Sequence, residues 1–390
     1  MRLEVVDVGR VTADLPDIQP FVDSLSGVDA IDLLITVSGF EPRVSAIAAA
    51  LRSAGVEVRA SCYLRYAFSE TQNAAQRRPL LEALNDLGTE PEAISVDIDE
   101  IDFAKEMQEQ IRRVSADDRM PVVLLDLSCA SGRLLLRVMS VLIESDVDLL
   151  VGYAQAEAYY PTKAEYLTWQ AVRDSIDVDD PSESPPAVLM RDVTLGLDTG
   201  VGDIETPLGY RGQHTETLPD RVVVIPGYNA ARPRAALAKI DSALIDNHPS
   251  QLVAWLVGEP KLERDAWRLD AVADTNGLRD PNGELVETVT PLSTFDYLAT
   301  IRTLDAKYLE FFGREQVTII PLGSKMQTLG VSLFCTMRPD VMVLLALPEQ
   351  YTDGPYSLGV EALWGIRFGP VDQLRERLFS LGQAVIVADD

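Results

Sequence analysis

The stretch 122–137, VVLLDLSCASGRLLLR, most constrains the fold, because an apolar run passes through a short polar turn directly into a helix. A near-continuous apolar run such as Val122–Leu127 is typical of a buried strand in a parallel sheet. The small residues at 128–132 let backbone N–H groups approach a ligand, and the helix start at Arg133 adds partial positive charge. The stretch therefore predicts an α/β fold with an anion site at the carboxyl end of one strand.

The second half of the chain repeats this arrangement. Val317–Leu329, VTIIPLGSKMQTL, again joins an apolar run to a helix through small residues, with Lys325 in the place of Arg133. Gly227 follows an earlier apolar run 188 positions after Gly39 (227 − 39), and the two cations are 192 positions apart (325 − 133). So small a difference in offset predicts an internal duplication. Two similar domains without a common origin are the alternative.

Strands and helices alternate in both halves. The expected strands are Ile31–Val37, Val56–Leu64, Ala93–Val96, Val122–Leu127 and Leu149–Tyr153, then Arg221–Ile225, Leu252–Val257, Val286–Val289, Val317–Pro321 and Val341–Leu347. Such alternation is typical of parallel βα units. The fold class that we expect is therefore α/β, with two Rossmann-like doubly wound parallel-sheet domains related by internal duplication.

At 390 residues the chain is long enough for two domains. We expect the first over 1–173 and the second over 219–390. Residues 174–218 include the acidic, Pro- and Ser-rich run IDVDDPSESPP and several glycines. This composition predicts a linker that begins with a flexible acidic loop and has room for a hairpin.

The formal net charge of −27 argues against a surface that coats a long nucleic acid, but it permits a local basic pocket for a small anion. The three cysteines show no CxxC spacing, which favours a reducing cytoplasm and argues against disulfides and zinc. No apolar run approaches the ~20 residues that span a membrane. With two histidines and neither GxGxxG nor a complete phosphate-binding loop, we expect no metal and no cofactor.

Ligands of open parallel sheets bind outside the carboxyl ends of the strands, where the strand order reverses. Arg133 and Lys325 are the strongest candidates there, because a cation in the first turn opposes the helix dipole unless an anion lies beside it. Glu41 and Asp126 are the candidate catalytic carboxylates. The candidate ligand-binding residues are Ser38, Gly39, Arg43, Ser128, Ser131, Gly132 and Arg133 in the first half, and Gly227, Asn229, Arg232, Ser324 and Lys325 in the second.

Each candidate also has a purely structural interpretation. The glycines could serve only tight turns. Arg43 could pair with Glu41, and Asp126, Ser128 or Ser131 could cap the following helix. The tyrosines that follow the fifth strand of each half could stack a base or only pack at the rim of a pocket: Tyr153, Tyr159 and Tyr160, then Tyr351 and Tyr356.

Asp126–Arg133, DLSCASGR, and Pro321–Met326, PLGSKM, resemble the fourth-strand loop of the CARF family, the Rossmann-like sensor domains of CRISPR-linked defence proteins. Arg133 takes the place of the usual lysine. The resemblance implies paired domains whose two pockets merge around a cyclic oligoadenylate. On this resemblance Ser38, Gly39, Arg43, Ser131, Gly132 and Arg133 line one half-site, and Gly227, Asn229, Ser324 and Lys325 line the other.

Three functions follow as hypotheses. The first is a nucleotide-binding sensor or adaptor of a prokaryotic defence or signalling system, with a small anionic nucleotide and a protein effector subunit as partners and a homodimer left open. The second is an enzyme on a phosphorylated substrate, either a phosphodiesterase that opens a cyclic nucleotide or a phosphoribosyl-type transferase. The third is an acidic structural subunit that docks a basic partner.

Overall fold

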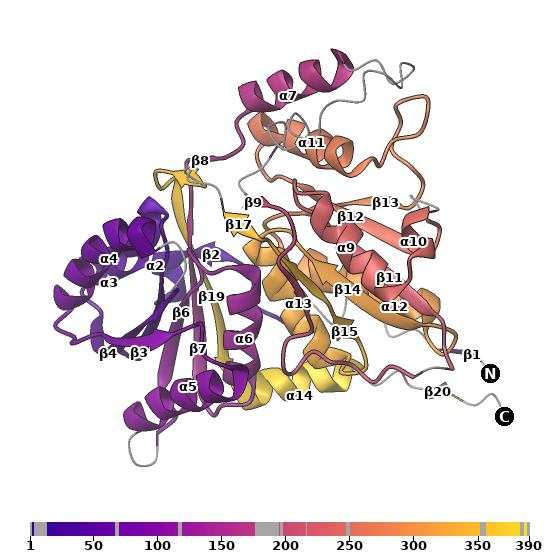
Figure 1. Ribbon diagram of the computed structural model, residues 1–390. Coiled ribbons are helices and arrows are strands. Elements are labelled where there is room, and N and C mark those ends of the chain that lie inside the picture. Colours follow the sequence, from indigo (N-terminus) through magenta and orange to yellow (C-terminus); the bar gives the residue numbers. More distant parts are fainter. Residues whose placement is uncertain are drawn as a thin grey trace.

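The computed structural model describes residues 2–3, 14–66, 70–115, 119–175, 195, 198–215, 217–246, 250–351, 356–382 and 386–387. Most of the acidic loop expected at the start of the linker lies outside these residues. Within them, two β-sheets stand side by side with a layer of helices between them (Figure 1). We call the seven-stranded sheet with its helices the first lobe, and the five-stranded sheet with its helices the second lobe.

The first lobe is built on a mixed sheet of strand order β2-β19-β7-β6-β3-β4-β5. Five of its strands are parallel: β3 (Ala30–Ser38), β4 (Glu57–Arg65), β5 (Glu92–Ser95), β6 (Val122–Asp126) and β7 (Asp148–Gln155). β3 is buried along its whole length, as the apolar run predicted. The strand order reverses between β3 and β6, so the crevice expected in a doubly wound sheet lies between the loops that follow these two strands.

The helices of the first lobe alternate with its parallel strands, as the sequence predicted. They are α2 (Phe21–Ser24), α3 (Ala46–Ala54) after a 3-10 turn η1 (Pro42–Ser45), α4 (Glu70–Asn85), α5 (Glu100–Val114) and α6 (Gly132–Ile143). Ser131 caps the start of α6, because its hydroxyl accepts a hydrogen bond from the Leu134 N–H. The structural interpretation of Ser131 as an N-cap residue is therefore confirmed.

The second lobe has a parallel sheet of order β13-β12-β11-β14-β15. Its strands are β11 (Asp220–Ile225), β12 (Val253–Glu259), β13 (Val289–Ser293), β14 (Gln316–Pro321) and β15 (Met342–Val343). Its helices are α9 (Ala231–Ile240), α10 (Ala243–Asp246), η3 (Glu263–Asp265), α11 (Trp267–Asn276), α12 (Tyr297–Phe311) and α13 (Lys325–Met337). The strand order matches the order β5-β4-β3-β6-β7 of the first lobe, so the two lobes present equivalent loops at equivalent edges.

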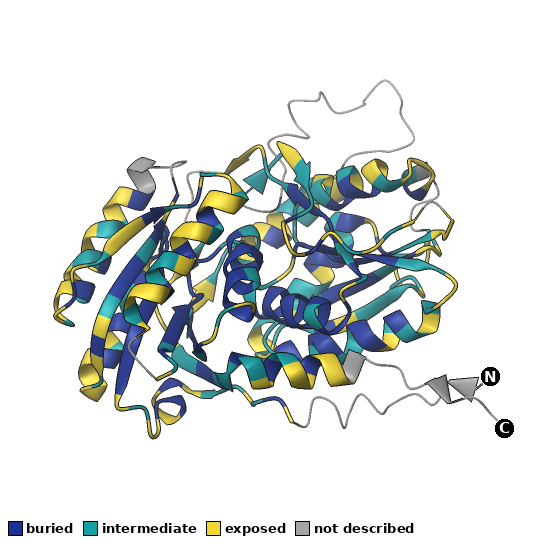
Figure 2. Cartoon of the chain, turned by 90° about the horizontal axis from the view of Figure 1, so that it is seen from below, coloured by how far each residue is buried: buried dark blue, intermediate teal, exposed yellow. Residues whose placement is uncertain are grey.

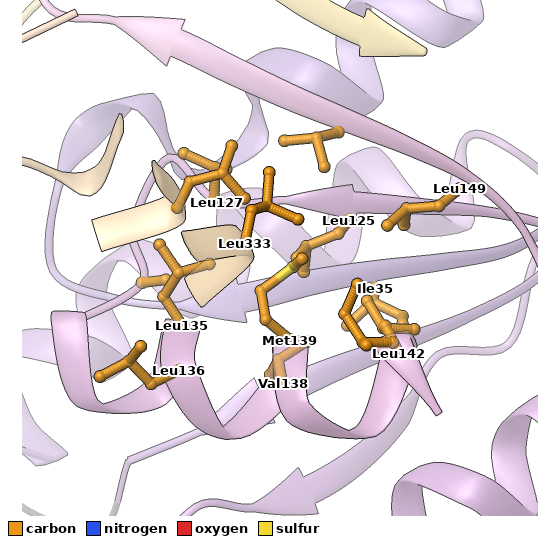
Figure 3. Packing of buried hydrophobic residues seen from close by; sticks show 14 of the residues in the cluster. Ile35, Leu125, Leu127, Leu135, Leu136, Val138, Met139, Leu142, Leu149 and Leu333 are labelled. Atoms are coloured by element: carbon orange, nitrogen blue, oxygen red, sulfur yellow. The ribbon is translucent and has the colours of Figure 1, made fainter. Parts of the chain in front are cut away.

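The two lobes share a hydrophobic core, and α6 and α13 pack against each other at its centre. Figure 3 shows Leu333 of α13 lying beside Leu135 of α6 and Leu127, the residue that directly follows β6. The Tyr210 hydroxyl bridges the two helices through the Leu136 carbonyl (3.1 Å) and the Ser332 hydroxyl (2.8 Å). Figure 2 shows these central helices as buried and the outer helices as exposed on one face. The lobes are therefore fixed relative to each other by apolar packing.

The expected second domain, 219–390, contains one strand that belongs to the first sheet and a helix that packs on it. The strand β19 (Ala362–Pro370) pairs antiparallel with β7, and β2 (Gln19–Pro20) pairs with the other side of β19. The helix α14 (Val371–Gly382) then packs on β19, α6 and α13. The sequence pattern predicted neither β19 nor α14. The first sheet is consequently mixed rather than all-parallel, and the chain returns to the first lobe after completing the second.

The short strands of the linker pair with the second lobe. β9 (Asp198–Thr199) pairs with β17 (Gln350–Tyr351), and β10 (Asp203–Glu205) pairs with β16 (Leu345–Leu347). Among the described residues the linker strands therefore pair with the end of the second lobe, and the expected hairpin between them is not formed.

Three further elements connect parts of the chain that are distant in sequence. β8 (Ala158–Tyr159) pairs with β18 (Ser357–Leu358), β1 (Arg2–Leu3) pairs with β20 (Ile386–Val387), and α7 (Lys163–Ser175) leaves the first lobe to pack on α11. In the part of the chain that the structure describes, no helix has the length and apolar character needed to cross a membrane.

Candidate functional site

A cavity of about 440 Å³ lies between the two lobes, at the carboxyl ends of both sheets. Its wall is formed by the loops after β3, β6 and β7 of the first lobe and after β11, β12, β13 and β14 of the second. The volume falls within the range of about 300–1,000 Å³ that is usual for small-molecule sites. Both fourth-strand loops, at the starts of α6 and α13, thus open into one cavity.

The cavity concentrates positive charge in an acidic protein. Among the described residues its wall holds six cationic side chains against three acidic ones: Arg43, Arg133, Arg232, Lys261, Arg268 and Lys325 against Glu41, Asp198 and Asp265. This is a formal excess of three positive charges, or of two (6 − 4) when Glu205, which pairs with Arg133, is included, in a chain whose net charge is −27. A wall with an excess of one sign favours guests of the opposite sign in the space that it encloses. The cavity is therefore suited to an anionic guest.

Arg133 lies in the first turn of α6 and is held by a carboxylate of the linker. Its Nε and Nη2 donate to Oε1 and Oε2 of Glu205 in β10, at 2.6 and 2.9 Å. The pair is partly open, with 36% of the Arg133 side chain and 21% of the Glu205 side chain exposed. Glu205 supplies the negative charge that a cation at this end of a helix requires.

Lys325 is the corresponding cation in the first turn of α13, and its partner comes from the first lobe. Its Nζ lies 3.4 Å from Oε1 of Glu41. The helix start itself is fixed by a capping box, in which Ser324 and Gln327 satisfy each other's backbone N–H groups. Both expected cations therefore line the cavity, and each is neutralised by a carboxylate from outside its own sheet.

Glu41 is the centre of a buried cluster. Its Oε2 accepts from Nε and Nη2 of Arg43 at 3.0 and 2.7 Å, and from the hydroxyl of Ser357. Arg43 in turn donates to the carbonyl of Ala154 and lies against the rings of two tyrosines. Burial alone would raise the pKa of the Glu41 carboxyl, but the charges of Lys325 and Arg43 hold that pKa below its usual range. Glu41 is therefore an ionised structural anion.

Asp126 ends β6 and does not line the cavity. Its Oδ1 accepts from the backbone N–H of Ser128 at 2.9 Å and from the Ser128 hydroxyl, which also accepts from the Ala154 N–H. Burial raises the pKa of Asp126 to about 6, against the effect of the Ser128 hydrogen bonds. Asp126 and Ser128 thus fix the turn before α6, and Asp126 caps this turn rather than the helix.

The linker forms another side of the cavity. Arg232 of α9 donates from Nη1 to Asp198 at 2.7 Å and from Nε to the Ala346 carbonyl at 2.7 Å. Asn229 donates from Nδ2 to the Asp198 carbonyl at 3.2 Å, and its side-chain oxygen accepts from the Ala231 N–H. These bonds tie the loop after β11 to the linker strands, so Arg232 and Asn229 hold the wall in place.

Among the residues that the structure describes, six aromatic rings line the same cavity: Tyr153, Tyr159, Tyr160, Tyr228, Phe295 and Tyr356. Tyr153 and Tyr159 are joined through their hydroxyls at 2.8 Å. Arg268 of α11 donates to the Tyr228 hydroxyl (3.0 Å) and the Tyr159 carbonyl (2.6 Å), so it links the lobes. Aromatic rings beside cations provide the surfaces on which a base stacks and a phosphate binds.

The cavity brings together most of the residues expected from the sequence and leaves others below it. Arg43, Ser131, Gly132, Arg133, Gly227, Asn229, Arg232, Ser324 and Lys325 line it, as does Glu41. Ser38, Gly39, Ser128 and Asp126 do not, because they lie at the buried strand ends. A Cβ on Gly39 would lie 2.9 Å from Cys129 Cβ, and one on Gly227 would lie 2.9 Å from the Leu322 carbonyl oxygen. Both glycines therefore allow the first and fourth loops of their lobe to touch.

Sequence reasoning missed the contribution of the loop after β12. Lys261, Leu262, Asp265 and Arg268 all line the cavity. Lys261 lies over the rings of Phe295 and Trp364, at 4.4 and 4.3 Å from the ring centres. The signal in the sequence that could have identified this loop is the run of charged residues shortly after the apolar strand Leu252–Val257. In the described part of the chain, no group of three His, Cys, Asp or Glu side chains is placed to hold a metal ion.

No protein-family model matches this chain, and no curated protein matches it either.

Proposed function

We propose that this protein is a nucleotide-binding sensor or adaptor, which holds a small anionic nucleotide in the cavity between its two Rossmann-like lobes. The observation that carries the proposal is the single cavity into which both fourth-strand loops open, with a formal excess of three positive charges in its wall. Two helix starts, at Gly132 and Lys325, add partial positive charge at the same place. The aromatic rings of the wall supply surfaces for a base.

The resemblance to the CARF family supports this proposal, because the residues of the two half-sites that it implies line one shared cavity, with the exceptions of Ser38 and Gly39. The equal strand order of the two sheets and the equivalent roles of Gly39 and Gly227 also support an internal duplication. In this interpretation the duplicated lobes form within one chain the pair that separate domains form elsewhere. A protein effector subunit would then respond to the occupied cavity.

Catalysis is less well supported than binding. A general base must be unprotonated and within hydrogen-bond reach of the proton that it removes. Glu41 is ionised, but its oxygens are already bound to Arg43, Ser357 and Lys325. Asp126 has a pKa of about 6, which suits a base, but it lies below the cavity wall. Neither candidate carboxylate is both free to accept a proton and within reach of a ligand in the cavity.

Titration calorimetry with a panel of linear and cyclic nucleotides tests the proposal. We expect saturable binding of at least one nucleotide, with a rise in the melting temperature that grows with ligand concentration. Mass analysis of the incubated ligand separates the three hypotheses: an unchanged bound ligand supports the sensor, and a new product would identify an enzyme. The absence of binding across the panel would leave the acidic structural subunit as the better account.

A further inference from the structure

The pair formed by Arg133 and Glu205 has a geometry that a ligand can replace. The guanidinium presents two parallel N–H groups to two carboxylate oxygens, at 2.6 and 2.9 Å. An Arg side chain presents the same fork to two oxygens of a phosphoryl group. Arg133 lines the cavity and Glu205 does not, so an anionic group of a ligand in the cavity would compete with Glu205 for the Arg133 guanidinium.

Two features show that Glu205 can leave this position at moderate cost. Both side chains are partly exposed, 36% for Arg133 and 21% for Glu205, so water can solvate the two charges when they separate, at a cost between that of an exposed and that of a buried pair. Among the described residues Arg133 is the only side chain that hydrogen-bonds Glu205, to which Arg137 adds a favourable charge. Glu41 at the other helix start is hydrogen-bonded by both Arg43 and Ser357. The two helix starts therefore differ: one carboxylate is exchangeable and the other is built into the protein.

We propose that Glu205 occupies a phosphate subsite at Arg133 in the ligand-free protein, and that the ligand carries a terminal phosphoryl group that displaces it. A phosphodiester brings a single negative charge, the same as the carboxylate that it would replace. A terminal phosphoryl group brings about −1.5 to −2 charges at pH 7 and a third acceptor oxygen. Replacing the carboxylate by a terminal phosphoryl group therefore increases the negative charge beside Arg133, whereas replacing it by a phosphodiester does not. This inference rests on the proposed function and selects among nucleotides.

The start of α6 favours the same group. The first turn of the helix contains no acidic side chain, and Ser131 leaves the cap fixed without using Arg133. Arg137 lies one turn further along α6, buried, with its guanidinium on the carbonyls of Val96 and Ile98. A phosphoryl group at Arg133 would therefore meet only positive charge from this helix once Glu205 has moved away.

The test compares Glu205→Gln with a control on the same strand. Asp203→Asn removes the same charge from β10, but Asp203 is exposed and has no cationic partner among the described residues. The probes are the 5′-monophosphates and the 3′,5′-cyclic monophosphates of adenosine and guanosine, measured by titration calorimetry. We expect the wild-type protein to bind a 5′-monophosphate at least about tenfold more tightly than the cyclic form of the same nucleoside.

Glu205→Gln should raise the affinity for the 5′-monophosphate about tenfold, because the ligand no longer competes with a carboxylate, and Asp203→Asn should not. Adding Arg133→Ala to Glu205→Gln should remove the gain. Equal binding of both probe types, an unchanged affinity in Glu205→Gln, or an equal gain in Asp203→Asn would overturn the inference while the proposed function stands. If neither the wild type nor Glu205→Gln binds any of these probes, the inference fails, whereas the proposed function fails only if the wider panel of linear and cyclic nucleotides also shows no binding. Circular dichroism of each variant shows whether it folds.

Discussion

The starts of α6 and α13 hold equivalent positions in their lobes, but their cations are balanced in different ways. Arg133 meets Glu205, which no other side chain of the described residues hydrogen-bonds, in a partly exposed pair. Lys325 makes one contact of 3.4 Å with Glu41, which two other side chains also hold. The two lobes thus have helix starts at equivalent places in their sheets, and the carboxylates beside the two cations are held to different degrees. The position of a cation in a motif does not determine whether it is available to a ligand.

The largest effect should follow from breaking the Glu41 cluster. Arg43→Ala leaves a buried carboxylate with fewer partners and removes the hydrogen bond to Ala154, so the free energy of unfolding should fall by about 3–5 kcal/mol. Arg133→Ala breaks a partly exposed bidentate pair and should cost less, about 1–2 kcal/mol. Urea denaturation of both variants measures the difference. Similar losses in the two variants would show that the comparison between the two carboxylates is wrong.

The second effect concerns binding at the two helix starts. Arg133→Ala leaves Glu205 unpaired and facing the ligand, so the affinity for a bound nucleotide should fall about a hundredfold. Lys325→Ala leaves Glu41 bound to Arg43, and its loss should be nearer about tenfold. The double variant should show no measurable binding while its melting temperature stays close to that of the wild type. A large fall in melting temperature would instead assign both cations to the framework.

The ends of the equivalent strands give a third comparison. β6 ends in Asp126, whereas β14 ends in Pro321, so a carboxyl is present in one lobe alone at this position. Burial raises the pKa of Asp126 from 3.8 to about 6, so the folded protein binds this proton more tightly than the unfolded chain does. The resulting stability is present below pH 4 and is lost as the pH rises to about 6.

Asp126→Asn should therefore stabilise the protein by about 1–3 kcal/mol at pH 7.5, and the gain should shrink as the pH falls toward 4. An asparagine oxygen can still accept both hydrogen bonds from Ser128. The measurement is the difference in unfolding free energy between variant and wild type at pH 4.5, 6 and 7.5, which cancels the other titrating groups. A constant difference across this range would show that Asp126 does not titrate there.

Much of the fold was predictable because parallel strands that are buried on both faces have near-continuous apolar sequences. β3 was expected at Ile31–Val37 and is observed at Ala30–Ser38, and β14 was expected at Val317–Pro321 and is observed one residue longer. β19 was missed because its sequence, ALWGIRFGP, mixes small, polar and aromatic residues and pairs with strands far away in the chain. Pairing over such distances leaves no local pattern.

The site was predictable to the extent that a single lobe determines it. Arg133 and Lys325 were found because a cation in the first turn of a helix is unusual, and both line the cavity. Glu205 and Arg268 were not found, because each acts across the boundary between parts of the chain and local sequence does not encode how the lobes pack. Ser38 was expected at the cavity but lies buried at the end of β3. The sequence shows where this strand ends but not how far its end lies below the surface of the cavity.

The smallest effect on binding should come from Lys261, in the loop after β12, and it tests how a cation of this loop differs from the cations at the two helix starts. It is the one cation of the cavity wall without a carboxylate within ion-pair distance among the described residues, and it rests on Phe295 and Trp364. An exposed charge of this kind acts through the long-range field, so Lys261→Ala should lower the nucleotide association rate about threefold at low salt and hardly at 0.5 M salt. Lys239→Ala, an exposed lysine of α9 away from the cavity, is the matched control. Stopped-flow mixing measures both rates. A loss that persists at high salt would place Lys261 in direct contact with the ligand, beside Arg133 and Lys325.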